Sequence, residues 1–93
     1  MSIRRLKISG ETAELVRTLH PDLKRKIKAA LQAILIDPQS GKALKDELEG
    51  FQSFKVGKFR VVYRKPADKG IIEVVAIGPR KTIYEETLRL LRK

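Results

Sequence analysis

Two basic residues, Lys55 and Arg60, flank a predicted turn at a spacing that suggests an anion-binding site. Gly57-Lys58 fits a two-residue type II′ hairpin turn, which places Lys55 directly opposite Arg60 on the same side of a sheet. Directly opposed cations destabilise a strand pair, so an anion between them would relieve the repulsion. Arg80 follows the neighbouring predicted strand and would complete a positively charged site large enough to bind one phosphate group. The alternative is that these long side chains splay into water.

The residue types present limit the chemistry of such a site. The chain has no cysteine and one histidine, His20, which excludes thiolate and multi-histidine metal sites and a cysteine nucleophile. His20 lies at a predicted helix boundary and is interpreted as a helix-entry residue. The acidic cluster Asp46, Glu47 and Glu49 lacks the ligand spacing of a metal site. One class of reaction needs only lysine, arginine and tyrosine: cleavage of RNA by its own 2′-hydroxyl, without metal or cofactor.

The charge of the chain favours a polyanionic partner. The 93 residues carry a net charge of +10, with 42% apolar and 34% charged residues, enough for the core of one domain spanning residues 1–93. Between Phe51 and Tyr84, eight basic residues face only two acidic ones. A merely soluble basic surface is the alternative explanation. Because no apolar run approaches the length of a membrane span or a secretory signal, we expect a cytoplasmic protein.

The first half of the sequence predicts a strand and two helices. Residues 3–8 alternate as a short strand does. Two helical stripes follow, separated by His20-Pro21, and the second ends at Asp37-Pro38. Such closely joined helices are expected to form an antiparallel hairpin. Residues 39–50 are interpreted as a loop with one helical turn near Leu44.

The second half predicts an antiparallel meander and a last helix. Lys55, Arg60, Val62 and Arg64 are expected to face away from the helices, and the alternate residues are expected to face them. The apolar segment 71–77 is predicted to be a central strand, and residues 84–93 a helix with Leu88 and Leu91 on one side. This order indicates a small α+β domain with its helices on one face of the sheet. The residues expected to form the core face are Phe54, Val56, Phe59, Val61 and Tyr63.

Two segments of the chain resemble a known toxin family. The segment 48–63, LEGFQSFKVGKFRVVY, is similar to the core of the RelE/ParE toxin superfamily, and the segment 77–84, IGPRKTIY, is similar to its closing element. The resemblance extends over nearly the whole chain and implies a RelE-like α+β fold. Within the superfamily, RelE-like members cleave mRNA in the ribosomal A site, whereas ParE-like members inhibit DNA gyrase. The short hairpin, with Arg60, Arg80 and Tyr84, favours the RelE-like branch.

The resemblance also implies roles for individual residues. Arg60 and Arg80 would contact the phosphate and the transition state, with Arg80 a candidate proton donor to the leaving oxygen. Tyr84 would stack on or orient the cleaved nucleotide, and Lys55 would lie nearest the attacking hydroxyl. The best-known RelE members carry two lysines where this chain has Ser53-Phe54-Lys55, so the identity of the general base is left open. The other basic residues expected to bind RNA are Lys58, Arg64 and Lys81.

The resemblance further implies a set of partners: a cognate antitoxin, the ribosome and mRNA, with no metal and no membrane. Leu88 and Leu91 of the last predicted helix are the expected antitoxin contacts. The expected activity is that of a ribosome-dependent endoribonuclease, the toxin of a type II toxin–antitoxin system. The alternatives are a ParE-like gyrase inhibitor and a non-catalytic basic protein that binds RNA or the ribosome.

Overall fold

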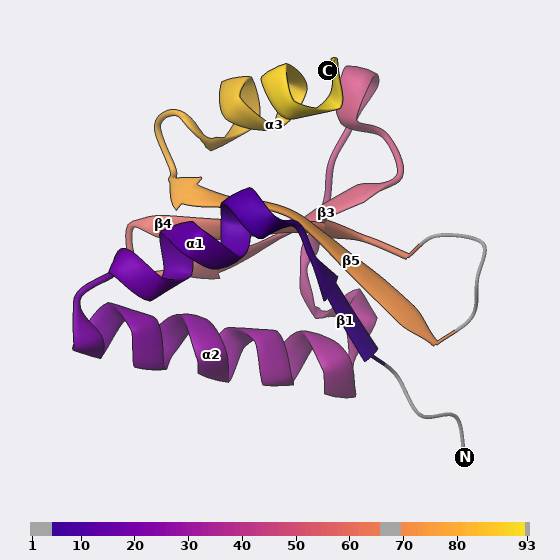
Figure 1. The fold of residues 1–93 in the computed structure, drawn as a ribbon. Helices are drawn as coiled ribbons and strands as arrows, with labels where there is room; N and C mark the ends of the chain where they lie inside the picture. The colour runs from indigo at the N-terminus through magenta and orange to yellow at the C-terminus, as the bar shows by residue number, and fades with distance from the viewer. Residues whose placement is uncertain (1–4, 66–69, 93) are drawn as a thin grey trace.

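The computed structural model describes residues 5–65 and 70–92, and its helices lie on both faces of one β-sheet (Figure 1). Helices α1 (Gly10–Thr18) and α2 (Pro21–Ile36) cover one face, and α3 (Ile83–Leu91) covers the other. Two short 3-10 segments, η1 (Pro38–Ser40) and η2 (Asp46–Leu48), connect α2 to the later strands. The predicted α+β class is confirmed. The prediction that all the helices share one face is wrong.

The sheet has five strands in the order β1-β5-β4-β3-β2. β1 pairs in parallel with β5, and the other neighbouring strands are antiparallel. β5 therefore has a neighbour on each side, which confirms the predicted central strand. β2 lies in a segment that was predicted to be a loop, because two residues are too few to produce an alternating pattern. The strands are β1 (Arg5–Ile8), β2 (Lys42–Ala43), β3 (Phe51–Val56), β4 (Phe59–Arg64) and β5 (Ile71–Pro79).

The turn between β3 and β4 has the predicted register. Lys55 pairs with Arg60, and Val56 pairs with Phe59. Gly57 has a φ of +58°, in the left-handed region, which a glycine adopts without steric cost at the first central position of a type II′ turn. The side chains of Lys55 and Arg60 consequently emerge on the same face of the sheet.

Alternate residues of β3 and β4 belong to two separate apolar clusters. Val56, Val61 and Tyr63 pack with buried residues of α2, as predicted. Val62 faces the other way, where it is fully buried against Ile83 of α3 rather than exposed as expected. The physical reason is an apolar strip on this second face that an amphipathic helix can cover. The buried residues of this second cluster are Leu48, Phe51, Val62, Ala76 and Ile83.

The first two helices each begin after a side-chain cap, and the second begins at Pro21, between the two predicted helical stripes. The Ser9 hydroxyl accepts a hydrogen bond from the Thr12 amide at 3.2 Å. His20 caps α2, because its Nδ1 accepts a hydrogen bond from the Asp22 amide at 3.2 Å and Pro21 occupies the first turn. The interpretation of His20 as a helix-entry residue is confirmed.

Some sequence predictions fall on residues outside the described ranges: the start of the first strand at Ile3, all but the last residue of a turn that the sequence predicts at 66–70, and Lys93 at the end of the last helix. Within the described ranges, no helix combines the length and the apolar character required to cross a membrane.

Candidate functional site

Four predicted site residues meet at the end of the sheet formed by the β3–β4 turn. Lys55 and Arg60 are cross-strand partners, and Arg60 is also paired with Gly78 of β5. Arg80 follows β5, and its backbone N–H donates a hydrogen bond to the Lys58 carbonyl at 2.8 Å. This bond joins the end of β5 to the turn. We call Lys55, Lys58, Arg60 and Arg80 the cation cluster.

The members of the cation cluster differ in exposure. Lys55, Lys58 and Arg80 are exposed, as is Lys81, which follows Arg80 directly. Arg60 is half-buried, and its Nε is buried with no hydrogen-bond partner among the described residues. Leaving a buried polar group unpaired costs about 1–3 kcal/mol, and more when the group is charged. Arg60 is therefore the member of the cluster whose position carries a stability cost.

Tyr84 joins the site through a buried serine. The Tyr84 hydroxyl donates to Ser53 Oγ at 3.4 Å, and Arg60 Nη1 donates to the same oxygen at 3.4 Å. Ser53 is only 2% exposed. Sequence reasoning identified Arg60 and Tyr84 but considered Ser53 only as the place of a missing lysine. The signal that could have identified it is strand alternation, which places Ser53 on the same face as Lys55.

Helix α3 places Tyr84 by burying the residues around it. Ile83 is 1% exposed and Thr87 is fully buried, with its hydroxyl donating to the Ile83 carbonyl at 2.8 Å. Tyr84 itself is half-buried and packs against the second apolar cluster. The N-terminal turn of α3 is consequently fixed on the sheet, and the tyrosine is fixed with it.

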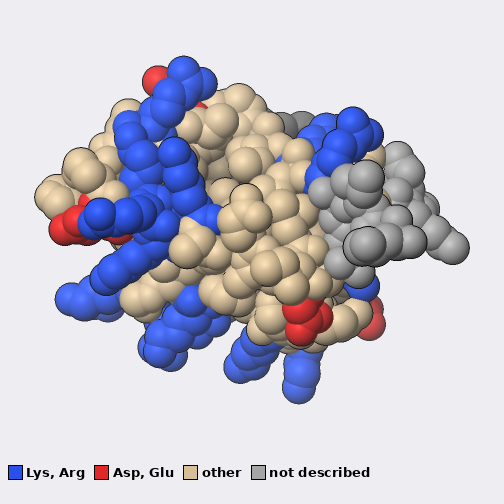
Figure 2. All heavy atoms as spheres, turned by 90° about the horizontal axis from the view of Figure 1, so that it is seen from below, with Lys and Arg blue, Asp and Glu red and all other residues tan. Residues whose placement is uncertain are grey.

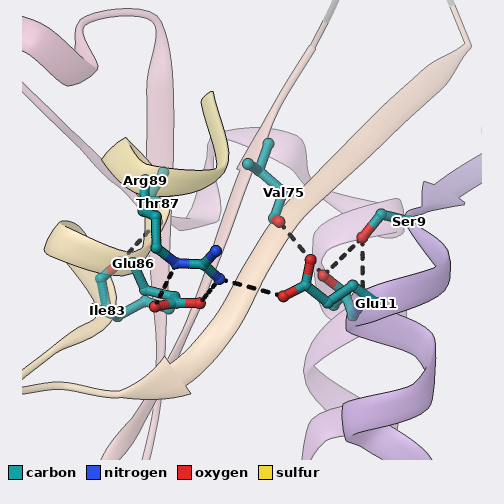
Figure 3. Close-up of polar contacts among 8 residues, drawn as sticks. Ser9, Glu11, Val75, Ile83, Glu86, Thr87 and Arg89 are labelled. Atoms are coloured by element: carbon teal, nitrogen blue, oxygen red, sulfur yellow. Dashed lines mark hydrogen bonds and ion pairs between the residues drawn. The ribbon is translucent and has the colours of Figure 1, made fainter. Parts of the chain in front are cut away.

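Ion pairs fasten the later turns of α3 (Figure 3). Arg89 contacts Glu86 in its own helix and reaches Glu11 of α1 at 3.2 Å. The hydrogen bonds to Glu86 and then to Glu11 raise the pKa of Arg89 above its ordinary value, so this guanidinium stays charged. Arg92 contacts Glu47 of η2 at 3.2 Å. These pairs are exposed, so the buried residues contribute most to the docking of α3.

Arg64, also predicted to bind RNA, is not part of the cation cluster. It lies at the opposite end of β4 from Arg60, roughly 13 Å away along the strand. Its Nε donates to Glu73 Oε1 at 2.5 Å, and its guanidinium lies 5.1 Å from the centre of the Phe51 ring. Both interactions hold Arg64 away from the turn.

The two leucines predicted to contact an antitoxin have different environments. Leu88 is half-buried against the second apolar cluster, whereas Leu91 is 39% exposed at the end of α3. Leu91 lines a groove of about 350 Å³ together with Arg64 and Glu73. Only Leu91 of the two offers an open apolar side chain to a partner.

Positive charge continues from the cation cluster onto α2. Figure 2 shows the face of the molecule on which α2 lies, where blue Lys and Arg side chains gather and red Asp and Glu are few. Lys26 of α2 and Lys55 of β3 line the same shallow groove of about 300 Å³.

Across the described residues, no group of three or more His, Cys, Asp or Glu side chains is arranged to hold a metal ion. The arrangement suits an extended polyanion better than a small neutral ligand. The basic residues of α2 are Lys24, Arg25, Lys26 and Lys28.

The sequence matches one family model, that of the ParE toxin of the type II toxin–antitoxin system parDE, over residues 7–84. No curated protein matches the chain in sequence.

Solved structures of toxins share the fold. A mutant of the Escherichia coli toxin RelE in the free state superposes with a TM-score of 0.75 at 18% identity, covering 96% of this chain and 97% of that one. The toxin–antitoxin complex RelBE2 from Mycobacterium tuberculosis gives a TM-score of 0.72 at 20% identity, covering 84% of this chain and 99% of that one. A YoeB/ParE toxin from Agrobacterium tumefaciens gives a TM-score of 0.71 at 19% identity, covering 82% of this chain and 98% of that one. At these identities the likeness concerns the fold.

Proposed function

The chain belongs to the ParE toxin family of type II toxin–antitoxin systems, within the RelE/ParE superfamily, and from the residues of its site we propose that it cleaves mRNA in the ribosomal A site. The observation that supports cleavage is that Lys55, Arg60 and Arg80 lie around the β3–β4 turn and that Tyr84 shares the Ser53 hydroxyl with Arg60. These residue types suffice for cleavage by the substrate's own 2′-hydroxyl.

The proposed reaction forms a bond from the 2′ oxygen to the adjacent phosphorus and breaks the bond from phosphorus to the 5′ oxygen. The products are a 2′,3′-cyclic phosphate and a free 5′-hydroxyl. Arg60 and Arg80 hold the non-bridging oxygens, because a guanidinium stays charged and presents paired donors to phosphate. Lys55 lies next to the attacking 2′-hydroxyl, whose proton passes to a general base that the sequence leaves open. Arg80 is the candidate donor of the proton that converts the leaving 5′ oxygen into a hydroxyl. Tyr84 stacks on or orients the nucleotide.

The proposed partners are the ribosome, mRNA and an antitoxin, and the proposed place of action is the cytoplasm. The RelBE2 structure from M. tuberculosis is a complex of a toxin with its antitoxin, which supports an antitoxin partner for this chain. The exposed Leu91 is the proposed antitoxin contact. The exposed cations of the cluster and of α2 would contact RNA, with binding that weakens as salt rises.

Primer extension on a defined mRNA tests the proposal. Ribosomes carrying the mRNA, and the same mRNA without ribosomes, are each incubated with the purified protein. Breaks confined to the A-site codon and absent from the naked RNA are the expected result. Intact mRNA in the presence of folded protein would overturn the proposal.

Gyrase inhibition is the second candidate, because the matching family model is that of the ParE toxin. It predicts that the protein inhibits supercoiling of plasmid DNA by purified gyrase and leaves ribosome-bound mRNA whole. Running both assays on one preparation separates the two activities.

A further inference from the structure

We propose that Ser53 is a positioning residue that holds Arg60 and Tyr84 together in the site. This role rests on the proposed function, because it assigns Ser53 a part in cleavage. Within residues 5–65 and 70–92, the Ser53 hydroxyl is the one polar side-chain group that both Arg60 and Tyr84 contact, each at 3.4 Å. Ser53 lies on β3, Arg60 on β4 and Tyr84 on α3, so one oxygen links three elements.

The burial of Ser53 makes this link specific. At 2% exposure its side chain is shielded from water, so water competes poorly for Oγ. A serine oxygen has two lone pairs, and the two donors use both of them. Val62 on β4 and Lys42 on β2 are its cross-strand partners, which fixes the backbone beneath the hydroxyl.

The link also determines which atoms remain for a substrate. Tyr84 directs its hydroxyl hydrogen to Ser53, so its oxygen lone pairs are left to accept a hydrogen bond from a bound nucleotide. Arg60 donates one Nη1 hydrogen to Ser53, and among the described residues no other group takes up its remaining terminal N–H groups, so they can bind a phosphate. Ser53 therefore orients an acceptor and a charged donor toward the same bound nucleotide.

Two double-mutant cycles test this role. The first measures urea unfolding of the wild type, Ser53→Ala, Tyr84→Phe and the double variant. If the hydroxyls interact, the effects of the two substitutions on the unfolding equilibrium constant are non-additive by about threefold to tenfold. Thr12→Val is the matched control, because Thr12 is also a buried hydroxyl residue but contacts Ser9 and Val75 instead. Its effect is expected to add simply to that of Tyr84→Phe.

The second cycle measures single-turnover cleavage on ribosomes. We expect Ser53→Ala to lower the cleavage rate about tenfold at saturating protein, with little change in the concentration needed for half-maximal rate. In the Tyr84→Phe background the same substitution should have a smaller effect, and Ser53→Thr, which keeps the hydroxyl, should restore most of the rate. Thr12→Val should leave the rate unchanged.

The outcomes separate this role from the proposed function. Additive effects in both cycles, or equal rates for Ser53→Ala and the wild type, would overturn the positioning role. If the wild type cuts no mRNA, the proposed function and the catalytic part of the role fail together. In that case the unfolding cycle still decides whether Ser53 holds Tyr84 in place.

Discussion

Arg60 is the residue on which the proposed chemistry depends most. Its side chain is half-buried, its Nη1 donates to Ser53, and its Nε has no partner among the residues described. A group held at such a cost is expected where it has a function. A phosphate bound to the terminal N–H groups of the guanidinium would offset this cost with charge-assisted hydrogen bonds, because the buried Nε itself is out of its reach.

Replacing Arg60 should abolish cleavage without unfolding the protein. Arg60→Ala removes the charge together with the unpaired Nε, so we expect the melting temperature to stay within a few degrees of wild type. Arg60→Lys keeps the charge but loses the paired donors, and the cleavage rate should fall at least about tenfold. Single-turnover cleavage and circular dichroism on the same preparations measure both effects.

Arg64→Ala is the matched control for Arg60→Ala, because it removes the same charge from the same strand. Losing the contacts of Arg64 with Glu73 and Phe51 should lower the free energy of unfolding by about 1 kcal/mol. The cleavage rate should change less than about threefold. Equal losses of cleavage in the two variants would mean that overall charge, and not the cluster, determines activity.

The sequence predicted the pairing of Lys55 with Arg60 but not the role of Ser53. A two-residue turn determines the register of its two strands, so the local sequence is enough to predict that Lys55 pairs with Arg60. The contact of Ser53 with Tyr84 joins residues 31 positions apart and exists only because α3 folds over the sheet. Nothing in the local spacing indicates that arrangement.

At the scale of elements, the position of α3 decides whether Tyr84 reaches the site. The amphipathic pattern predicted the helix, but the face it covers was predicted wrongly, since a helix with one apolar side can pack on either face of a sheet. The apolar side chains of Phe51, Val62 and Ala76 on the second face resolve this in the structure. Their alternation with the main core residues was the available signal.

Ile83→Ala should therefore reduce both stability and cleavage. Ile83 is 1% exposed beneath the first turn of α3, and its truncation should lower the free energy of unfolding by about 2–5 kcal/mol. Loosening this turn displaces Tyr84, so we expect cleavage to fall under conditions where the protein remains folded. Ile36→Ala, the same substitution at a residue 78% exposed, should change neither. Wild-type cleavage by folded Ile83→Ala would show that α3 does not position Tyr84.

Tyr63 joins β4 to the segment after α2. Its hydroxyl donates to the Pro38 carbonyl at 2.8 Å and accepts from the Gly41 amide at 3.0 Å. Burial raises the pKa of the Tyr63 phenol above its ordinary value. The unfolded chain therefore loses this proton first as pH rises past about 10, so the stability contributed by the neutral phenol is present below that pH and is lost above it.

Tyr63→Phe should remove the part of the stability that is lost at alkaline pH because of the Tyr63 phenol. At pH 7 the variant should be less stable by about 1–3 kcal/mol, because the Pro38 carbonyl and Gly41 amide lose their partner. The difference in unfolding free energy between the variant and the wild type should shrink between about pH 9 and 11, roughly one unit on either side of the ordinary tyrosine pKa. The reason is that only the wild type carries the phenol. Urea unfolding across this range measures it, and a constant difference would contradict the assignment.

The whole molecule combines a basic surface with a fold that toxins of the superfamily share. The net charge of +10 and the cations of α2 favour a polyanion, and the family match establishes a type II toxin. Neither of these specifies the reaction. The cation cluster, Ser53 and Tyr84 are the features that favour RNA cleavage.

The most direct test of that claim uses an mRNA with a single 2′-deoxynucleotide at the position cut in the A-site codon. The proposed mechanism takes its nucleophile from the substrate, so ribosomes carrying this mRNA should show no cut there. The all-ribose mRNA should be cut at that position and leave a 2′,3′-cyclic phosphate. Cleavage of the deoxy-substituted mRNA at the same position would contradict the mechanism, because the nucleophile would then have to come from elsewhere.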